Sequence, residues 1–486
     1  MKELRDERIR KLREIREMGT DPYPAKTRRD TKIGDIISNY GAYEDKTVTV
    51  AGRIIGIRKF GKIAFVVIRD FSGEIQLFMQ DDGDLKNLNL FDPGDFVEAT
   101  GQVGKTKTGE ISVMTKNLKL LTKSLRPMPT KQDGFTNKEE RLRRRYVDMN
   151  VNQDVRDRFI RRSKFWQATR DFLNQNEFIE INIPVLEHTT GGADANPFVT
   201  HMDALDQDFY LRISHELPLK RLIGAGYERV YDIGPRFRNE NYSDEHLPEH
   251  VAMEWYAAYW DWQDGMKFME DMYKYTLQEA FGTLKFNVRG FEIDMGGQWE
   301  VKSYPDLIQE HYGIDVYNTT LEEVQKALCD NKLEVEKNNI LPRGIDKLWK
   351  AIRETIGGPI WVINEPKFLS PLAKTADDGV SAQRFHPIIA GTELGNGFSE
   401  LNDPLDQLER FTEQQKMRDA GDDEAQMLDI DFVEMLEYGM PPACGWGHSE
   451  RVFWVFEGVS AREGVPFPQL RREVDAVTRT IYSELP

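Results

Sequence analysis

The apolar and polar positions change their spacing several times along the chain, and each change marks a different element. Apolar residues at helical spacing among charged ones predict an amphipathic helix over residues 1–18, which Gly19 and two prolines end. From Thr47 the pattern becomes short runs rich in β-branched and aromatic residues, separated by glycine and aspartate turns. Five such runs in succession predict a small barrel of short strands.

The expected barrel is of the OB type, whose strands present aromatic and basic side chains to single-stranded nucleic acid. The next stretch, LRPMPTKQDGF, contains two prolines and a glycine and predicts a linker. Helical spacing resumes at Lys138 and predicts a long helix over 154–176, which the run FIEINIPVLEH follows. The predicted domains are a helix and barrel over 1–125, a linker over 126–150 and a larger domain over 151–486, with a mostly helical stretch over 262–365.

The stretch from Arg229 to Asp261 carries the densest chemistry and is predicted to be a hairpin. Side chains alternate faces along a strand, so Arg238 and Glu240 are expected on one face of the first strand. Glu254 and Tyr256 are expected to share a face of the return strand in the same way. The connection, residues 241–249, is polar, with turn-forming residues and His246 near its middle.

These residue types suit two different ligand groups. The fork of an arginine matches two oxygens of a phosphate or carboxylate, and a carboxylate beside a phenol suits an ammonium. Each pair alone is better explained by salt bridges on an exposed hairpin. The combination of an Arg-x-Glu, a polar loop with a histidine and a Glu-x-Tyr instead favours a binding site.

Composition narrows the classes of function. The 486 residues fit two or three domains, and 40% hydrophobic with 30% charged residues is typical of a soluble globular protein. The net charge of −17 argues against a nonspecific nucleic-acid coat, because such binding depends on neutralising phosphates. Any RNA contact is therefore local; the basic segments 2–16 and 138–164 could supply it, or could equally be solvated helix faces.

Cysteine content and the lack of targeting patterns bear on location. Two cysteines exclude a disulfide framework, and no spacing of cysteine and histidine suggests structural zinc. No segment resembles a membrane span or a secretory signal. A cytoplasmic location, with no membrane partner, is the expectation.

Three stretches carry a resemblance to a known family. FRNE, its loop and MEWYAAYWD resemble motif 2 of the class II aminoacyl-tRNA synthetases, specifically of the lysyl-tRNA synthetases. The helix and strand over 154–184 resemble motif 1, and GWGHSERVFWVFEG with the later REGVPFP resembles motif 3. The resemblance implies an α+β fold: an N-terminal OB-type barrel and a catalytic domain built on an antiparallel sheet flanked by helices. It also implies a homodimer that forms through the motif 1 region.

The resemblance implies a lysine site and a nucleotide site. Its lysine-binding residues would be Gly192, Glu216, Glu254, Tyr256, Asn396 and Glu400. Its ATP-binding residues would be Arg238, Glu240, His246, His250, Glu393 and Arg451, of which Arg238, Glu240, His246 and Arg451 would act in catalysis. Mg²⁺ would be the cofactor, bound by Glu393 and Glu400.

Several positions depart from the family pattern. His386 stands where the family usually has a second magnesium-binding glutamate, which leaves the number of ions open because magnesium strongly prefers oxygen. His250 stands where the family stacks a phenylalanine on adenine, and Glu245 where a basic residue is common. Motif 3 is one residue short, which makes the placement of Arg451 less certain.

The barrel and the site together imply tRNA(Lys), L-lysine and ATP as partners. In the resemblance, Arg58, Phe65 and Gln76 contact anticodon bases by stacking and by reading base edges, although Phe65 alone fits an ordinary core residue. DIGPRFR resembles the aspartyl and asparaginyl enzymes, whereas ISHE, EWY and ELGNGFSELND favour the lysine enzyme. Two rival hypotheses are a catalytically silent RNA-binding paralogue and a ligase that modifies a protein, and the complete barrel argues against the second.

Overall fold

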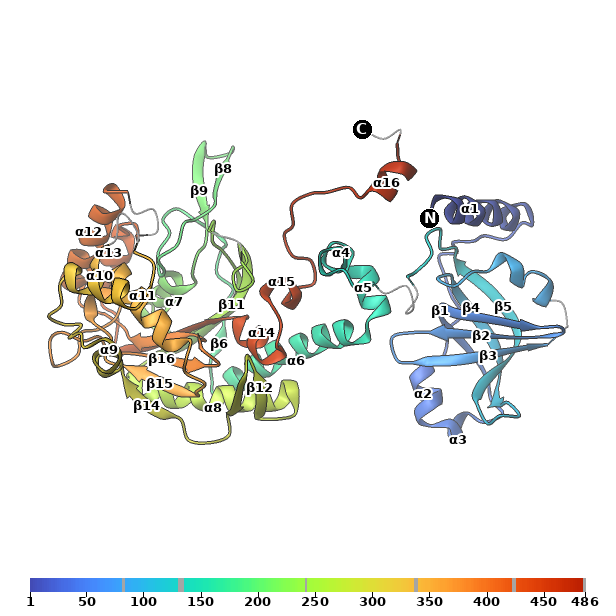
Figure 1. The fold of residues 1–486 in the computed structure, drawn as a ribbon, viewed down its shortest axis with the longest axis horizontal. Helices are drawn as coiled ribbons and strands as arrows, with labels where there is room; N and C mark the ends of the chain where they lie inside the picture. The colour runs from blue at the N-terminus through green and yellow to red at the C-terminus, as the bar shows by residue number, and fades with distance from the viewer. Residues whose placement is uncertain (81–83, 130–134, 241–242, 336–339, 422–424, 484–486) are drawn as a thin grey trace. The chain divides into compact units, whose positions relative to one another are not determined.

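The computed structural model describes residues 1–80, 84–129, 135–240, 243–335, 340–421 and 425–483. Part of the predicted linker, 130–134, and Asn241 and Tyr242 of the predicted motif 2 loop lie outside the described residues. The chain divides into two units (Figure 1), one formed by residues 1–151 with 470–486 and the other by residues 152–469. The sequence places its boundary after residue 150 but gives no sign that the segment 470–486 returns to the first unit.

The first unit is built around a five-stranded barrel. Its strands are β1 (Thr47–Phe60), β2 (Ile63–Arg69), β3 (Glu74–Gln80), β4 (Phe96–Lys105) and β5 (Ile111–Thr122). They pair in the order β1-β2-β3-β5-β4, and β4 also pairs with β1, so the barrel closes. Alternate residues such as Val66, Ile68 and Leu77 fill its interior. The predicted OB-type barrel is confirmed.

Short helices complete the first unit. The predicted N-terminal helix is α1 (Lys2–Glu17), whose Leu12 and Ile15 are buried. The others are α2 (Ile33–Ser38), α3 (Tyr40–Tyr43), α4 (Lys138–Arg143), α5 (Arg145–Val151) and α16 (Ala476–Ile481), with 3-10 turns η1 (Asp84–Lys86) and η2 (Leu88–Leu90). These elements leave the outer face of β1 to β3 as the part of the unit where the predicted anticodon residues lie.

The segment 470–486 is bound to basic residues of the first unit. Arg144 Nη2 lies 2.6 Å from Asp475 Oδ2, and Arg143 donates to the carbonyl oxygen of Arg471 at 2.6 Å. Arg126 donates to Thr478 Oγ1 at 3.3 Å. Part of the basic run that begins at Lys138 is therefore paired within the protein.

The second unit is organised by a nine-stranded sheet (Figure 1). The strands are β6 (Ile179–Glu180), β10 (Arg229–Phe237), β11 (Glu249–Ala258), β14 (Glu300–Ser303), β15 (Ile360–Ile363), β16 (Arg384–Ile389), β17 (Thr392–Glu393), β18 (Asn396–Ser399) and β19 (Ala443–Ser449). Their order is β14-β15-β16-β18-β19-β11-β10-β6, with β17 paired to β16. The two outermost pairs are parallel and the interior pairs are antiparallel, as the predicted antiparallel sheet requires.

Alternation along β11 separates the two faces of this sheet. Trp255 and Ala257 pack into a core with α6 (Gln153–Gln175) and α8 (Trp262–Phe281). Tyr256 and Ala258 pack on the other face, with α7 (Glu216–Gly224), α12 (Pro404–Asp419) and α13 (Ile430–Tyr438). The second face is therefore the one on which Glu254 and Tyr256 lie together, as predicted.

The region 262–365 is less helical than the sequence predicts. It contains α8, α9 (Tyr304–Tyr312), α10 (Leu321–Asp330) and α11 (Leu341–Arg353), but also the hairpin β12 (Lys285–Val288) and β13 (Phe291–Asp294). Its β14 and β15 belong to the main sheet. Short apolar runs such as IWVI do not show by their spacing alone whether they form strand or buried helix, which explains the error.

The part of the second unit that the structure describes contains six further elements. They are β7 (Leu186–Glu187), β8 (Val199–Met202) and β9 (Gln207–Leu211), which form a three-stranded sheet, with η3 (Lys367–Leu369), α14 (Arg451–Glu457) and α15 (Ala461–Gly464). Within the described ranges, no helix has the length and apolar character needed to cross a membrane.

Candidate active site

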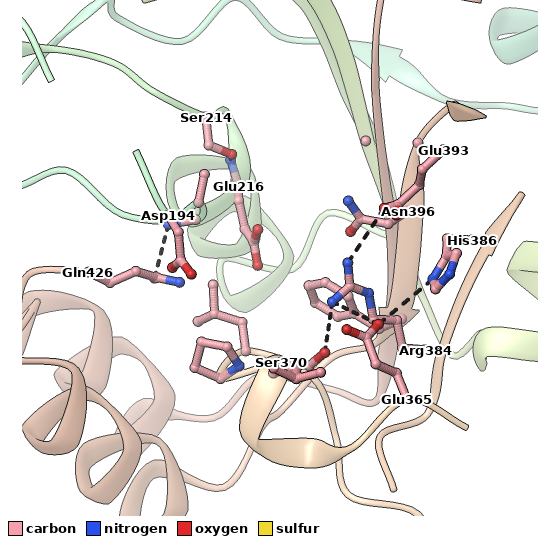
Figure 2. Close-up of a pocket in the computed structure, with 18 of the residues that line it drawn as sticks. Asp194, Ser214, Glu216, Glu365, Ser370, Arg384, His386, Glu393, Asn396 and Gln426 are labelled. Atoms are coloured by element: carbon pink, nitrogen blue, oxygen red, sulfur yellow. Dashed lines mark hydrogen bonds and ion pairs between the residues drawn. The ribbon is translucent and has the colours of Figure 1, made fainter. Parts of the chain in front are cut away.

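A cavity of about 870 Å³ opens on the face of the sheet that α7 and α12 cover. Its walls come from β10, β11, β16, β18 and β19 and from the helices α7, α11 and α12, and Figure 2 draws part of its lining. Every predicted lysine, nucleotide and metal residue lines it except Glu400. Residues far apart in the sequence thus meet in one place.

The hairpin forms as predicted, but its first strand is shorter than expected. β10 ends at Phe237, so Arg238 and Glu240 do not share a strand face; both lie in the connection and still line the cavity. The backbone there is held by Arg238 N–H donating to Pro248 O at 2.9 Å and Asn239 N–H donating to Asn196 O at 2.7 Å.

Glu254 is the best-bound carboxylate of the cavity. The hydroxyl of Ser214 donates to it at 2.8 Å, the backbone N–H of His215 at 3.1 Å and the phenol of Tyr256 at 3.3 Å. Burial and the surrounding carboxylates hold the pKa of Tyr256 well above its ordinary range, so the phenol keeps its proton. Arg236 Nη1 also lies 3.5 Å from Glu254 Oε1, so this pair presents a carboxylate that is partly balanced within the protein, beside a hydrogen-bonding hydroxyl.

Two further carboxylates, Glu216 and Glu400, meet on a buried lysine that sequence reasoning missed. Lys220 Nζ donates to Glu216 Oε1 at 2.5 Å and forms an ion pair with Glu400. Burial alone would lower the pKa of Lys220, but the two carboxylates outweigh it and raise that pKa. The i, i+4 spacing of Glu216 and Lys220 on a helix was the one available sequence signal.

Two glycines allow the backbone to approach this acidic end closely. A Cβ on Gly192, whose φ is +84°, would lie 2.6 Å from Cβ of Glu216. A Cβ on Gly445 would lie 2.3 Å from Oε1 of Glu400 and 2.3 Å from the ring of Tyr256. Larger side chains at either position would displace the groups that line the acidic end.

The opposite wall of the cavity is cationic. Among the arginines that line the cavity, four have an Nε atom that is buried without a hydrogen bond among the described residues: Arg238, Arg353, Arg384 and Arg451. An unsatisfied buried donor costs free energy unless a ligand completes it. Because four guanidiniums share this condition, the wall is suited to a polyanion.

The predicted nucleotide residues in this part of the cavity differ in charge and in their partners. Arg451 is the first residue of α14, and burial lowers its pKa. Partial burial and Arg451 lower the pKa of His246 to about 4, so its imidazole is neutral at pH 7. Glu245 in the same loop pairs with Arg289 at 2.9 Å.

His250 is bound within the protein on both ring nitrogens. Arg236 Nε donates to His250 Nε2 at 2.8 Å, so the ring proton is on Nδ1. His250 Nδ1 then donates to the carbonyl oxygen of Leu247 at 3.1 Å. Burial and then Arg238 lower the pKa of Arg236 to about 9, which leaves the guanidinium charged at pH 7. The imidazole therefore has a fixed orientation in the cavity wall.

The residues predicted to hold magnesium do not fit a protein-bound ion. Glu400 is already paired with Lys220, and His386 offers only nitrogen, whereas magnesium prefers oxygen. Glu393 lies 3.8 Å from Arg353 and 3.8 Å from Arg384, so its charge is opposed by two guanidiniums. The described part of the chain holds no group of three His, Cys, Asp or Glu side chains placed to bind a metal.

The predicted anticodon residues lie on the outer face of the barrel. Arg58 is exposed at the end of β1, and Phe65 of β2 lies opposite it, outside the barrel core. Gln76 is buried and donates to Ser112 Oγ at 3.0 Å. Sequence reasoning missed Phe60 and Phe78, whose ring centroids lie 6.3 and 5.4 Å from that of Phe65.

Each of the two units matches a known protein family. The family model described as tRNA synthetases class II (D, K and N) matches residues 137–471, and that described as OB-fold nucleic acid binding domain matches residues 48–121. Curated relatives named lysine–tRNA ligase include one from Fervidobacterium nodosum, 42% identical over 98% of this chain and 95% of the relative. Another, from Roseiflexus sp. strain RS-1, is 43% identical over 97% of this chain and 99% of the relative.

A third relative of the same name, from Clostridium acetobutylicum, is 41% identical over 97% of this chain and 94% of its own length. The similarity thus extends over the barrel, the cavity and the connections between them. On this basis the chain belongs to the lysyl-tRNA synthetase family of the class II tRNA synthetases.

Proposed function

We propose that the protein joins L-lysine to tRNA(Lys) with the consumption of ATP. In the first step the lysine carboxylate attacks the α-phosphorus, which forms lysyl-adenylate and releases pyrophosphate. In the second step a ribose hydroxyl at the 3′ end of the tRNA attacks the lysyl carbonyl and releases AMP. No covalent enzyme nucleophile is needed, so catalysis depends on positioning and on stabilising charge at phosphorus.

The observation that carries this proposal is the division of one cavity into an acidic end and a cationic wall. Glu254, Tyr256 and Glu400 form the acidic end, and Lys220 links Glu400 to Glu216. The side chain of lysine is a cation on a flexible stem, and this end would hold its ammonium. We assign Gly192 and Glu216 to the α-amino group and Asn396 to the carboxylate, which would then point toward the arginines.

The cationic wall would receive the triphosphate. Arg238 would contact the α-phosphate, where charge develops during attack, and Arg451 with the neutral imidazole of His246 would hold the terminal phosphates. Glu240 would contact the adenine or ribose side, and His250, fixed by Arg236, would stack on adenine.

The barrel would bind the anticodon of tRNA(Lys). Phe65 lies within a group of three phenylalanines on the outer face, and such rings stack on unpaired bases. Arg58 would contribute a charged contact, and Gln76 would read a base edge once its bond to Ser112 opens. The cytoplasmic location stays a prediction.

We also propose a homodimer through the motif 1 region. β6 lies at the edge of the main sheet, and Ile179 on it is 52% exposed. An exposed apolar side chain on an edge strand favours pairing with a second copy. Light scattering on the purified protein would test this state: a mass near 56.3 kDa would contradict it.

Amino-acid-dependent exchange of labelled pyrophosphate into ATP, run with all twenty amino acids, tests the proposed reaction. Exchange with lysine alone is the expected result, because the acidic end disfavours ligands without an ammonium. Exchange with aspartate or asparagine would contradict the assignment of the acidic end. The absence of exchange, with or without tRNA, would favour a silent RNA-binding paralogue.

A further inference from the structure

The wall of the cavity around Glu393 is built from two arginines that the family resemblance does not assign. Arg353 is the last residue of α11, and its Nη1 lies 3.8 Å from Glu393 Oε2. Arg384 is the first residue of β16, and its Nη2 lies 3.8 Å from Glu393 Oε1. Glu393 therefore sits between two guanidiniums.

Glu365, on the same wall, is also paired. Arg384 Nη1 lies 3.1 Å from Glu365 Oε2, and Figure 2 shows these two side chains next to each other near His386. Glu400 is paired with Lys220. A bound cation at Glu393 would have to compete with arginines that are already in place.

His386 adds no oxygen ligand to this wall. It is 1% exposed, neither ring nitrogen makes a hydrogen bond among the described residues, and Nδ1 is 3.8 Å from Glu365 Oε2. A site made of Glu365, Glu393 and His386 would require Arg384 to leave the space between the two carboxylates. Magnesium would then have two carboxylates and a nitrogen, a poor set for an ion that demands oxygen ligands.

We propose that Arg353 and Arg384 supply, at Glu393, the positive charge that a protein-held ion would otherwise supply, so that magnesium enters this cavity only on the nucleotide. Arg353 is then a phosphate-binding residue, and Arg384 fixes Glu393 and Glu365. This inference rests on the proposed binding of ATP in the cavity.

The free donors support a direct contact with phosphate. Nε of Arg353 and Nε of Arg384 are both buried without a hydrogen bond among the described residues, like those of Arg238 and Arg451 in the same cavity. The contacts of Arg353 and Arg384 with Glu393, at 3.8 Å, are too long to be hydrogen bonds. The guanidinium of Arg353 therefore keeps donors for the oxygens of a triphosphate, whereas Arg384 Nη1 already donates to Ser370 Oγ at 2.9 Å and pairs with Glu365.

Counting bound Mn²⁺ by electron paramagnetic resonance tests the inference, with α,β-methylene-ATP as a nucleotide that cannot be activated. Ions bound without nucleotide are subtracted, because an acidic protein binds some on its surface. We expect the nucleotide to add one tight ion per cavity in the wild type. His386→Glu, which places a carboxylate beside Glu393, should raise this number to two, whereas the matched control His386→Gln should leave it at one.

Two results would overturn the inference: two or more added ions in the wild type, or only one in His386→Glu. Arg353→Gln provides a separate test, in which calorimetry measures the affinity for nucleotide and for lysine. It should weaken binding of α,β-methylene-ATP by about 10- to 100-fold and leave binding of lysine unchanged; unchanged nucleotide affinity would contradict the role of Arg353. If the wild type bound no nucleotide, the proposed function would fail and this inference with it.

Discussion

The ammonium of Lys220 forms an ion pair with the carboxylate of Glu400, and both side chains are completely shielded from solvent. Glu216 holds the same ammonium from the preceding turn of α7. Lys220 thus neutralises part of the acidic end, and Glu254 adds a further carboxylate nearby, 3.5 Å from Arg236. The remaining negative charge is what a lysine substrate would balance.

Replacing Lys220 by methionine should strongly destabilise the second unit. Glu216 and Glu400 would remain buried without their cation, and removing one partner of a buried ion pair typically costs ~3–5 kcal/mol. Denaturant unfolding would measure the loss. Lys302→Met is the control, because the Lys302–Glu300 pair is exposed and such pairs contribute less than about 1 kcal/mol. Equal losses in the two variants would contradict the importance of the buried pair.

Glu254→Gln should reduce lysine activation much more than nucleotide binding. The substitution removes the charge that Ser214, His215 and Tyr256 hold in place. A lost charge-assisted hydrogen bond of ~1.5–3 kcal/mol corresponds to about 10- to 100-fold in kcat/KM for lysine. Pyrophosphate exchange, measured at varied lysine concentration and then at varied ATP concentration, separates the effect on lysine from the effect on ATP. Glu413→Gln, at the cavity margin, is the control. Parallel losses for both substrates would count against the assignment.

Phe65→Ala should weaken tRNA charging and leave lysyl-adenylate formation unchanged, because the ring lies on the barrel and not in the cavity. Stacking of a base on an aromatic ring contributes ~1–3 kcal/mol, so KM for tRNA should rise roughly 5- to 100-fold. The control is Phe71→Ala, which removes a phenyl group that is 71% exposed in a turn of the same barrel. The anticodon assignment fails if both variants behave alike.

Stability should depend on pH through Glu187. Burial raises the pKa of this carboxyl from 4.5 to about 8. The folded state therefore keeps a proton that the unfolded chain releases, so this contribution to stability is complete below about pH 4.5 and is lost as pH rises through 8. Glu187→Gln should raise Tm at pH 8.5 by a few degrees and change it little at pH 5. Exposed Glu310→Gln should show no such difference between the two pH values; a flat response of Glu187→Gln would refute the prediction.

Much of the fold follows from patterns that are local in sequence. The two-residue period of β11 places Glu254 and Tyr256 on one face, and the five short runs after Thr47 form the barrel. The same period fails for Arg238 and Glu240, because β10 ends at Phe237, before both of them. Where a strand ends is set by its partner, which the spacing of one segment does not report.

The parts of the site that the sequence did not predict are contacts between residues far apart in the chain. Lys220 meets Glu400, and Arg353 meets Glu393, across large separations in the chain, so neither pair has a motif. Only the resemblance brought Glu393 and Glu400 into the site before the structure did. The arginines that flank Glu393 remained unnoticed because isolated arginines on a helix end or a strand most often face solvent.

The return of residues 470–486 to the first unit has a consequence for biosynthesis. Arg144 and Asp475 belong to one unit, but the ribosome makes all of residues 152–469 between them. The barrel is ready to fold early, because every strand it needs precedes that point. The contacts of Arg126, Arg143 and Arg144 with the returning segment form only after the second unit has been translated. Until then Arg143 and Arg144 have their partners within α4, Glu139 and Glu140, and lack the contacts that the returning segment supplies.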